Sequence, residues 1–345
     1  MKIKGPVQAW IVDDTGFPKK GTHSVGVARQ YCGQVGKQDN CRVAVSLSVS
    51  TPTASLPIAF RLYLPEAWAH DAGRGKQAGV PEQIRLQTKP QMALEQIRQA
   101  VQGEVTRAPV LADAGYGVDS QFRAGVTELG LAYVVGVQSS TSVGEPGKAP
   151  LPAKPWGGKG RPPRLLGRDK NHRPVSVKQL ALSLPASAWK TIPWREGTKQ
   201  PLQSRFAVLR VRPAHRDHES AEPYPEEGLL LEWPKQQSEP TKYWLSTLPK
   251  DRRLRELVRM AQHRWIIERD YEELKQELGL GHYEGRGWRG FHHHATLCIA
   301  AYGFLVAERS RFSPSARTGH VGLPAPKLPP DFQPRGSTAH PRRTA

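Results

Sequence analysis

The sequence of 345 residues predicts an α/β protein in which a run of strands precedes alternating helices and strands. Alternating apolar and polar residues predict strands between residues 42 and 64, and short apolar runs predict buried strands at 9–12 and 109–112. Apolar residues at helical spacing predict helices at 90–103 and 254–278. Strands that are interleaved with helices in this way are typical of an α/β unit.

The first predicted strand is the apolar run Ala9–Val12, which leads directly into Asp13 and Asp14. A buried strand that ends in acids presents carboxylates to whatever cleft lies at its end. Neighbouring residues of a strand point to opposite faces, so the sequence leaves open whether Asp13 or Asp14 enters that cleft.

An antiparallel meander is predicted next. Residues 23–31 form a second candidate strand, residues 42–50 alternate as a half-buried strand does, and residues 58–64 repeat the pattern. The links between these segments are short, which favours antiparallel pairing.

A helix at 90–103 then precedes a short buried strand at 109–112, which ends at Asp113. A second helix at 119–130, with Asp119 or Ser120 as its cap, and a strand at 131–137 complete the unit. We expect the two strands that end in acids to lie side by side, with their carboxylates at one edge of the sheet.

Composition divides the chain into four segments. Residues 1–138 form the first part of the α/β domain, and 139–250 form a basic loop followed by a β-rich insertion. Residues 251–309 supply the C-terminal helices of that domain, and the Pro-, Ser- and Arg-rich stretch 310–345 predicts a disordered basic tail. The loop at 139–173 suits a solvated linker and a loop that follows DNA equally well.

Tryptophans gather in the predicted insertion, at Trp189, Trp194, Trp233 and Trp244. Tryptophans at such positions belong to the core in most proteins, whereas an exposed indole could stack on a base. The sequence does not select which of them would do so.

The charge of the chain points to a polyanionic partner. Lys and Arg outnumber Asp and Glu by 50 to 31, a formal charge of +19, so nucleic acid is the first partner to consider and a membrane surface the second. No apolar stretch reaches the roughly 18 residues that a membrane span needs. The three cysteines form no CxxC pair, and the N-terminus shows no secretory signal, so we expect a cytoplasmic protein.

The helix at 254–278 carries an apolar seam and a charged face. The seam consists of Leu254, Leu257, Val258, Ala261, Trp265, Leu274 and Leu278. On the polar face, Arg264, Glu268 and Lys275 are four and seven residues apart, so they stack along one side. Such a row could hold a metal ion beside a phosphate, although an isolated helix of this composition is more often a solvated salt-bridge ladder.

The consecutive histidines His292, His293 and His294 do not predict a zinc site, because they point in different directions on a helix and no other ligands accompany them. Asp13, Asp113 and Glu268 together offer hard oxygen ligands that suit Mg²⁺ or Mn²⁺. Two such ions roughly 4 Å apart can assist attack on a phosphodiester.

Three motifs carry a resemblance to a known family. These are Asp13-Asp14-Thr15-Gly16-Phe17-Pro18-Lys19-Lys20-Gly21, Ala112-Asp113-Ala114-Gly115-Tyr116-Gly117, and the segment from Arg264 to Lys275. In order and local pattern they resemble the motifs of bacterial insertion-sequence DDE transposases, and the similarity extends to about Arg309.

The resemblance implies a ribonuclease-H-like fold with a mixed sheet, flanking helices and a β-rich insertion. It implies that Asp13, Asp113 and Glu268 coordinate Mg²⁺ or Mn²⁺, as two ions, and that Arg264 and Lys275 bind DNA phosphates. The tyrosine of the family signature is replaced here by Ala261. Tyr271 could substitute for it from one turn later, or pack in the core.

The resemblance also implies a function. We expect metal-dependent cleavage and strand transfer of DNA, acting on terminal inverted repeats and target DNA in the bacterial nucleoid, with a homodimer on paired ends as one arrangement. Only Met1 to Gln8 precede the first strand, so we expect the helical end-recognition segment of relatives to be missing. The alternatives are a catalytically silent DNA-binding remnant and a ribonuclease-H-like nuclease without strand transfer.

Overall fold

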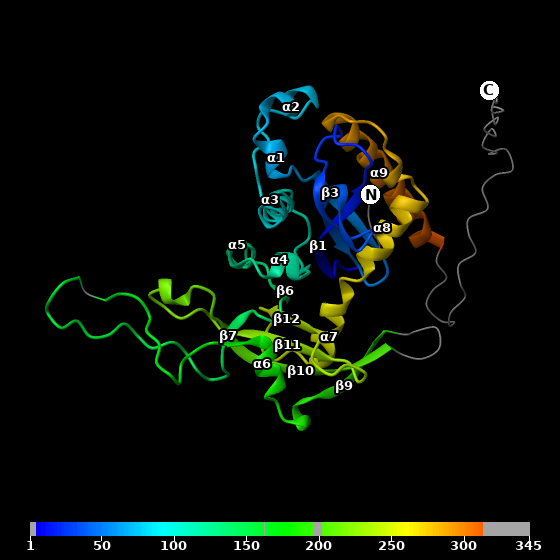
Figure 1. The fold of residues 1–345 in the computed structure, drawn as a ribbon. Helices are drawn as coiled ribbons and strands as arrows, with labels where there is room; N and C mark the ends of the chain where they lie inside the picture. Colours follow the sequence, from blue (N-terminus) through cyan, green and yellow to red (C-terminus); the bar gives the residue numbers. More distant parts are fainter. Residues whose placement is uncertain (1–4, 162, 196–201, 313–345) are drawn as a thin grey trace, which may run out of the picture.

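The computed structural model describes residues 5–161, 163–195 and 202–312. Its strands build a mixed sheet whose first half is packed between two layers of helices, and whose second half extends as a β-rich platform (Figure 1).

The first half of the sheet is ordered β2-β3-β1-β5-β6, with β4 also paired to β3. Its strands are β1 (Ala9–Pro18), β2 (Ala28–Cys32), β3 (Lys37–Ser50), β4 (Ser55–Leu62), β5 (Val110–Ala112) and β6 (Tyr133–Val137). Strand β3 runs antiparallel to β1, whereas β5 is parallel to both β1 and β6. A mixed sheet with helices on both faces confirms the predicted α/β fold with flanking helices.

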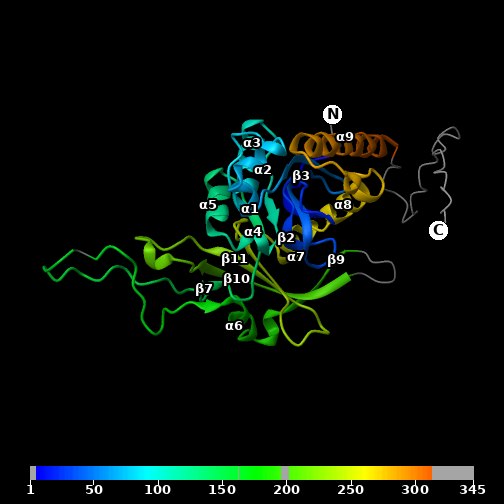
Figure 2. The ribbon, with the colours of Figure 1, turned by 45° about the horizontal axis from the view of Figure 1, so that its top comes forward.

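The helices of this half are α1 (Glu66–Ala69), α2 (Ala72–Gln77), α3 (Lys89–Gln102), α4 (Ala114–Gly117), α5 (Ser120–Glu128), α7 (Leu254–His263), α8 (Ile266–Gln276) and α9 (Trp288–Phe312). Helices α3 and α5 lie on one side of β1 and β3, and α8 and α9 lie on the other (Figure 2). Because both faces are covered, β3 is buried from Cys41 to Ser50 rather than half-buried, as its alternation had predicted.

Two strand boundaries differ from the prediction. Strand β1 does not end at Asp13 but continues to Pro18, because β3 pairs with it along its whole length. Strand β2 begins only at Ala28, and Val25 and Val27 are buried in the loop before it.

The insertion extends the main sheet, since β12 pairs antiparallel with β6. Its strands are β7 (Ser142–Gly144), β8 (Val175–Ser176), β9 (Lys190–Arg195), β10 (Leu202–Pro213), β11 (Glu227–Trp233) and β12 (Lys242–Ser246). The helix α6 (Val177–Leu182) and the 3₁₀ turns η1 (Ala186–Ala188) and η2 (Asp217–Glu219) connect them. The basic loop between β7 and β8 projects as a long arm, drawn in green (Figure 1).

The four tryptophans of the predicted insertion are buried or partly buried. Trp189 packs edge-on against Trp233, with ring centroids 5.3 Å apart, Trp194 is partly buried, and Trp244 is buried. The exposed indoles among described residues are instead those of Trp156 and Trp265.

The C-terminal helices differ from the single helix predicted at 254–278. Backbone bonds of the i to i−3 type, Trp265 N to Gln262 O and Glu268 N to Trp265 O, tighten the chain and separate α7 from α8. The 3₁₀ turn η3 (Leu280–His282) links α8 to α9, which extends to Phe312. The tail was predicted to begin at residue 310; residues 313–345 lie outside the described part.

Helix α9 contains the three histidines. His292 accepts a bond from Leu62 N at 3.2 Å, and His294 lies 2.9 Å from Gly279 O.

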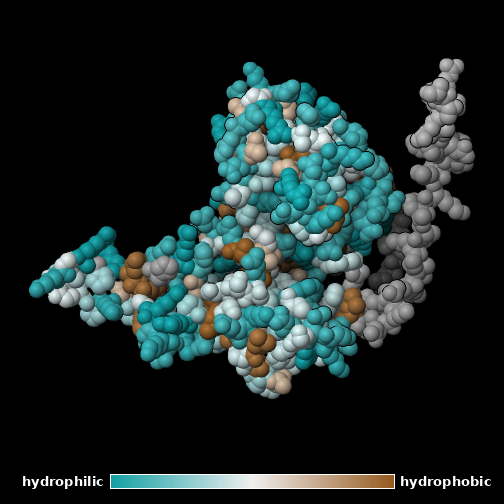
Figure 3. Space-filling view, viewed as in Figure 1, coloured by the Kyte–Doolittle hydropathy of each residue, from teal (hydrophilic) through white to brown (hydrophobic). Residues whose placement is uncertain are grey.

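No helix in the described residues is long and apolar enough to cross a membrane. The visible surface is mostly hydrophilic, with scattered apolar patches (Figure 3).

Candidate active site

The candidate site lies where β1 and β5 separate. These strands pair only through Trp10–Val110 and Ile11–Leu111, after which β1 stays on β3 and β5 ends at Ala112. Asp13 and Asp113 each follow this last pairing by two residues. The acids therefore lie at the point where the parallel pair opens, as the sequence predicted.

Strand β6 approaches the backbone of Asp113 closely. A Cβ at Gly136 would lie 2.9 Å from Ala114 N, and one at Gly117 would lie 1.9 Å from Gly136 O. Only glycine fits at both positions, so the turn after Asp113 is seated against β6. The Asp113 carboxylate caps α4, since Oδ1 accepts a bond from Gly115 N at 2.8 Å.

Asp13 and Asp14 point to opposite faces of the sheet. Asp14 faces α3 and α4, where its Oδ2 is 3.1 Å from Lys89 Nζ and accepts a bond from Tyr116 OH at 3.2 Å. Asp13 faces the junction of α7 and α8, and its Oδ2 accepts a bond of 2.6 Å from Arg264 NH1. Of these two acids, Asp13 is the one on the side of Glu268.

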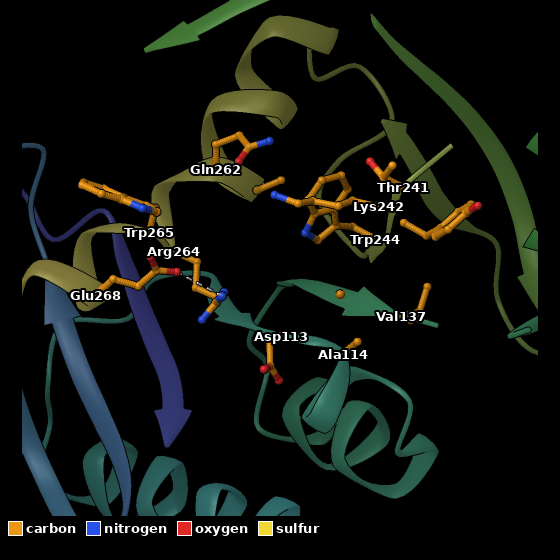
Figure 4. Close-up of a pocket in the computed structure, with 13 residues that line it drawn as sticks. Asp113, Ala114, Val137, Thr241, Lys242, Trp244, Gln262, Arg264, Trp265 and Glu268 are labelled. Atoms are coloured by element: carbon orange, nitrogen blue, oxygen red, sulfur yellow. Dashed lines mark ion pairs between the residues drawn. The ribbon is translucent and has the colours of Figure 1, made fainter. Parts of the chain in front are cut away.

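Arg264 lies among the three predicted acids. It caps the C-terminal end of α7, pairs with Asp13, and has its NH2 3.8 Å from Glu268 Oε1. Electrostatic attraction from Asp13, Asp113 and Glu268 raises the pKa of Arg264 against the opposing effect of burial. Figure 4 shows its guanidinium between Glu268 and Asp113.

Burial dominates the electrostatics of Asp13. Its side chain is 13% exposed, and burial raises the pKa of its carboxyl to about 7. Arg264 lowers this pKa, whereas the neighbouring carboxylates of Asp113 and Asp14 raise it further. The guanidinium therefore offsets only part of the cost of a charged Asp13.

A pocket of about 230 Å³ opens beside this cluster. Asp113, Arg264 and Glu268 line one side, and residues of β12 and α7 line the other (Figure 4). Lys242 and Gln262 are among them, and sequence reasoning missed both. Nothing in the sequence around either residue distinguishes it from other surface polar residues.

The acids of α8 have different surroundings. Glu268 is 53% exposed at the pocket, whereas Asp270 is fully buried and accepts bonds from the hydroxyls of Tyr302 and Ser55. Glu273 pairs with Arg309 at 2.7 Å. Glu268 is therefore the acid of this helix that adjoins Arg264.

Lys275 lies two turns beyond Glu268 within α8, so the two residues share one side of that helix. Lys275 Nζ lies 2.8 Å from Gly16 O and 3.2 Å from Gln34 Oε1. Burial lowers the pKa of Lys275 to about 8. Its amine is thus placed farther along β1.

Tyr271 does not replace the missing signature tyrosine at this pocket. Its buried hydroxyl lies 2.6 Å from Ser46 Oγ, on the side of α8 that packs against the sheet. The other residues of the predicted apolar seam are buried or partly buried. Trp265 is the exception, since it is 39% exposed and lines the pocket.

Among the described residues, no three His, Cys, Asp or Glu side chains are arranged so that they could hold a metal ion. Asp13, Asp113 and Glu268 flank the Arg264 guanidinium instead of meeting at one point. The donors present are nevertheless carboxylate oxygens, which are the ligands that Mg²⁺ and Mn²⁺ prefer.

Comparisons with known proteins identify a relative and a family for this chain. Over 139 residues the chain is 33% identical to a probable transposase for insertion sequence element IS701 of Microchaete diplosiphon. The match covers 40% of this chain and 34% of that protein, so the chain spans about a third of the length of the relative.

A solved structure, the NurA nuclease from Sulfolobus solfataricus, is 8% identical, with 90% of this chain and 87% of that chain covered. Its TM-score of 0.32 is too low to support an argument about the fold.

The family described as DDE superfamily endonuclease matches residues 2–201, more than half of the chain. The matched residues include Asp13 and Asp113 and end before Glu268, which only the structure places beside them. The chain belongs to the DDE superfamily of endonucleases and resembles insertion-sequence transposases within it.

Proposed function

We propose that this protein is an insertion-sequence transposase that cleaves DNA in a metal-dependent reaction and transfers the cut strand to target DNA. The observation that carries the proposal is the position of Asp13, Asp113 and Glu268 around Arg264, at the opening between β1 and β5. The formal charge of +19 supports a polyanionic substrate.

We assign Asp13, Asp113 and Glu268 as the ligands of Mg²⁺ or Mn²⁺. The buried Asp13 carboxyl, with a pKa raised to about 7, lacks full compensation from Arg264, so a further cation fits this site. Endonucleases of this superfamily generally use divalent metal ions. When bound, such ions stabilise the charge that develops as water or a 3′-hydroxyl attacks a phosphodiester.

The other residues position the substrate. Arg264 holds Asp13 in place through a charge-assisted hydrogen bond from NH1, and the other N–H donors of its guanidinium can contact a phosphate oxygen. Lys242 lines the same pocket and adds positive charge opposite Asp113. Lys275 serves a phosphate farther along β1.

The test is nicking of a duplex that carries the inverted repeats flanking the coding frame, with Mg²⁺ or Mn²⁺ present. We expect nicks at the repeat ends and, with target DNA added, joined products. Asp13→Asn, Asp113→Asn and Glu268→Gln should each abolish nicking, while DNA binding keeps its salt dependence.

The matched control is Glu272→Gln, since Glu272 is an exposed acid one turn farther along α8. It should nick as the parent does. Nicking without joining would show a nuclease without strand transfer, and binding without nicking would contradict the proposed enzyme altogether.

A further inference from the structure

A second cleft, of about 500 Å³, lies beyond the C-terminal end of β1. The connection between β1 and β2 forms one wall with Lys19, Lys20 and His23. The connection between η3 and α9 forms the other with Glu284 and Arg286. We call it the basic cleft.

The walls of the basic cleft are fastened to each other. Val25 N donates to Arg286 O at 2.9 Å, and Lys19 Nζ donates to Tyr283 O at 2.6 Å. Behind them Arg42, which is 1% exposed, donates to Tyr283 O at 3.0 Å. A buried guanidinium bound to backbone carbonyls of one wall holds that wall in a fixed shape.

The β1–β2 connection is fixed in the same way. Asn40 Nδ2 donates to Lys19 O at 2.6 Å and to Gly21 O at 2.9 Å, so the backbone that carries Lys20 is tied to β3. The cleft is therefore preorganised, and a ligand would not have to order these loops when it binds.

Positive charge exceeds negative charge in the basic cleft. Lys19, Lys20 and Arg286 give three positive charges against one negative charge from Glu284, a net +2 with His23 neutral. Lys19 lies 3.5 Å from Glu284, while Lys20 and Arg286 are exposed and have no side-chain partner within the described residues. Two unpaired cations in a fixed cleft suit an anion.

The distance to the carboxylates fits DNA. Strand β1 is continuous from Asp13 to Pro18, so Lys19 lies about 20 Å from Asp13 at the usual rise of a strand. Successive phosphates of one duplex strand are spaced by about 3.4 Å along the axis, so 20 Å would correspond to about six base pairs of a duplex that runs along β1. Lys275, at Gly16, lies between the two sites.

We propose that the basic cleft binds a backbone phosphate of the DNA duplex about six base pairs from the phosphate that is cut. Lys20 and Arg286 supply the contacts, and Lys19 and Arg42 keep the walls in place. The assignment rests on the proposed function, since it takes DNA as the substrate.

The test is the salt dependence of binding between the full-length protein and an end-carrying duplex, measured without divalent metal. The double variant Lys20→Ala, Arg286→Ala should bind about tenfold more weakly than the parent, with the slope of log K against log salt shallower by about 1 to 2. The charge-preserving pair Lys20→Arg, Arg286→Lys should restore most of the binding. Arg98→Ala, an exposed cation on α3 across the sheet, should match the parent.

Duplexes with one uncharged methylphosphonate linkage locate the contact. The parent should lose affinity when the linkage lies about six base pairs from the repeat end, and the double variant should be insensitive to it. The proposal is overturned if the double variant keeps the parental salt slope, or if the parent is sensitive to linkages elsewhere in the duplex. It is also overturned if the double variant loses more affinity for an RNA duplex of the same sequence than for DNA, or if the parent does not bind the DNA duplex. These measurements need no catalysis, so a protein that binds in this way but never nicks defeats only the proposed enzyme.

Discussion

The two sides of helix α8 carry the same chemical group in opposite surroundings. On one side Glu268 is half exposed beside Arg264 and lines the pocket. On the other, Asp270 is fully buried between the hydroxyls of Ser55 and Tyr302, and burial raises its pKa. The buried acid has neutral donors and serves the fold, whereas the exposed acid has spare lone pairs and is available for a ligand.

The largest loss of stability is expected on the buried side of α8, at Asp270. Asp270→Ala leaves the Ser55 and Tyr302 hydroxyls without an acceptor inside the core, so the free energy of unfolding should fall by about 2–4 kcal/mol. Urea denaturation measures it. Asp270→Asn keeps one acceptor and should lose less; equal losses in the two variants would show that packing, not hydrogen bonding, sets the cost.

A smaller loss is expected one residue later. Tyr271→Phe removes the bond to Ser46 but keeps the ring in the core, and should cost about 1 kcal/mol in the same measurement. Nicking should remain at the parental rate wherever both proteins are folded. A stable variant that nicks slowly would instead place the phenol in contact with the substrate, as in the family signature.

Lys275 gives a pH-dependent effect at the far end of the helix. Because burial lowers its pKa from the ordinary 10.5 to about 8, the unfolded chain binds more protons than the folded protein between these values. Stability relative to Lys275→Met should therefore rise as the pH increases from 8 to 10. Urea unfolding of both proteins at pH 8 and pH 10 measures this change. If the difference in free energy of unfolding between the two proteins is the same at both pH values, the amine of Lys275 is solvated in the folded protein.

The smallest effect on stability is expected on the exposed side. Glu268→Gln should lie within about 0.5 kcal/mol of the parent, as should Glu272→Gln, because Glu268 is 53% exposed and its pairing with Arg264 is loose. Thermal unfolding of the two variants in parallel gives the comparison. A loss as large as that of Asp270→Ala would make Glu268 part of the scaffold.

The strand-end acids could be predicted from the sequence because they depend on local patterns. Apolar runs before Asp13 and Asp113 predict that the two acids lie close together, and both lie at the opening between β1 and β5 although Asp13 is inside β1. The sequence could not show that β1 continues beyond Asp13, since that depends on pairing with β3. The same pairing fixes which of Asp13 and Asp14 faces α8.

The break between α7 and α8 could not be predicted, because the tight turn at Arg264 has no proline or glycine to announce it, and periodicity assumes a constant 3.6 residues per turn. The partners of Lys275, Gly16 and Gln34, could not be predicted either, because they are tertiary contacts. Arg264 itself was placed correctly near Glu268, since only four residues separate them. Its bond to Asp13, 251 positions away in the chain, is a tertiary contact that no spacing reveals.

The most direct test of the central claim compares two acids of one helix in one assay. Single-turnover nicking of the end-carrying duplex with Mn²⁺ is measured for Glu268→Gln and Glu272→Gln at a temperature where both are folded. We predict that the nicking rate of Glu268→Gln falls below about one hundredth of the parental rate, while that of Glu272→Gln is unchanged. Loss of a residue that only orients a metal ligand lowers activity by up to about a hundredfold, and loss of the ligand itself should lower it at least as much. Parental nicking by Glu268→Gln would contradict the assignment of this side of α8 to the metal site.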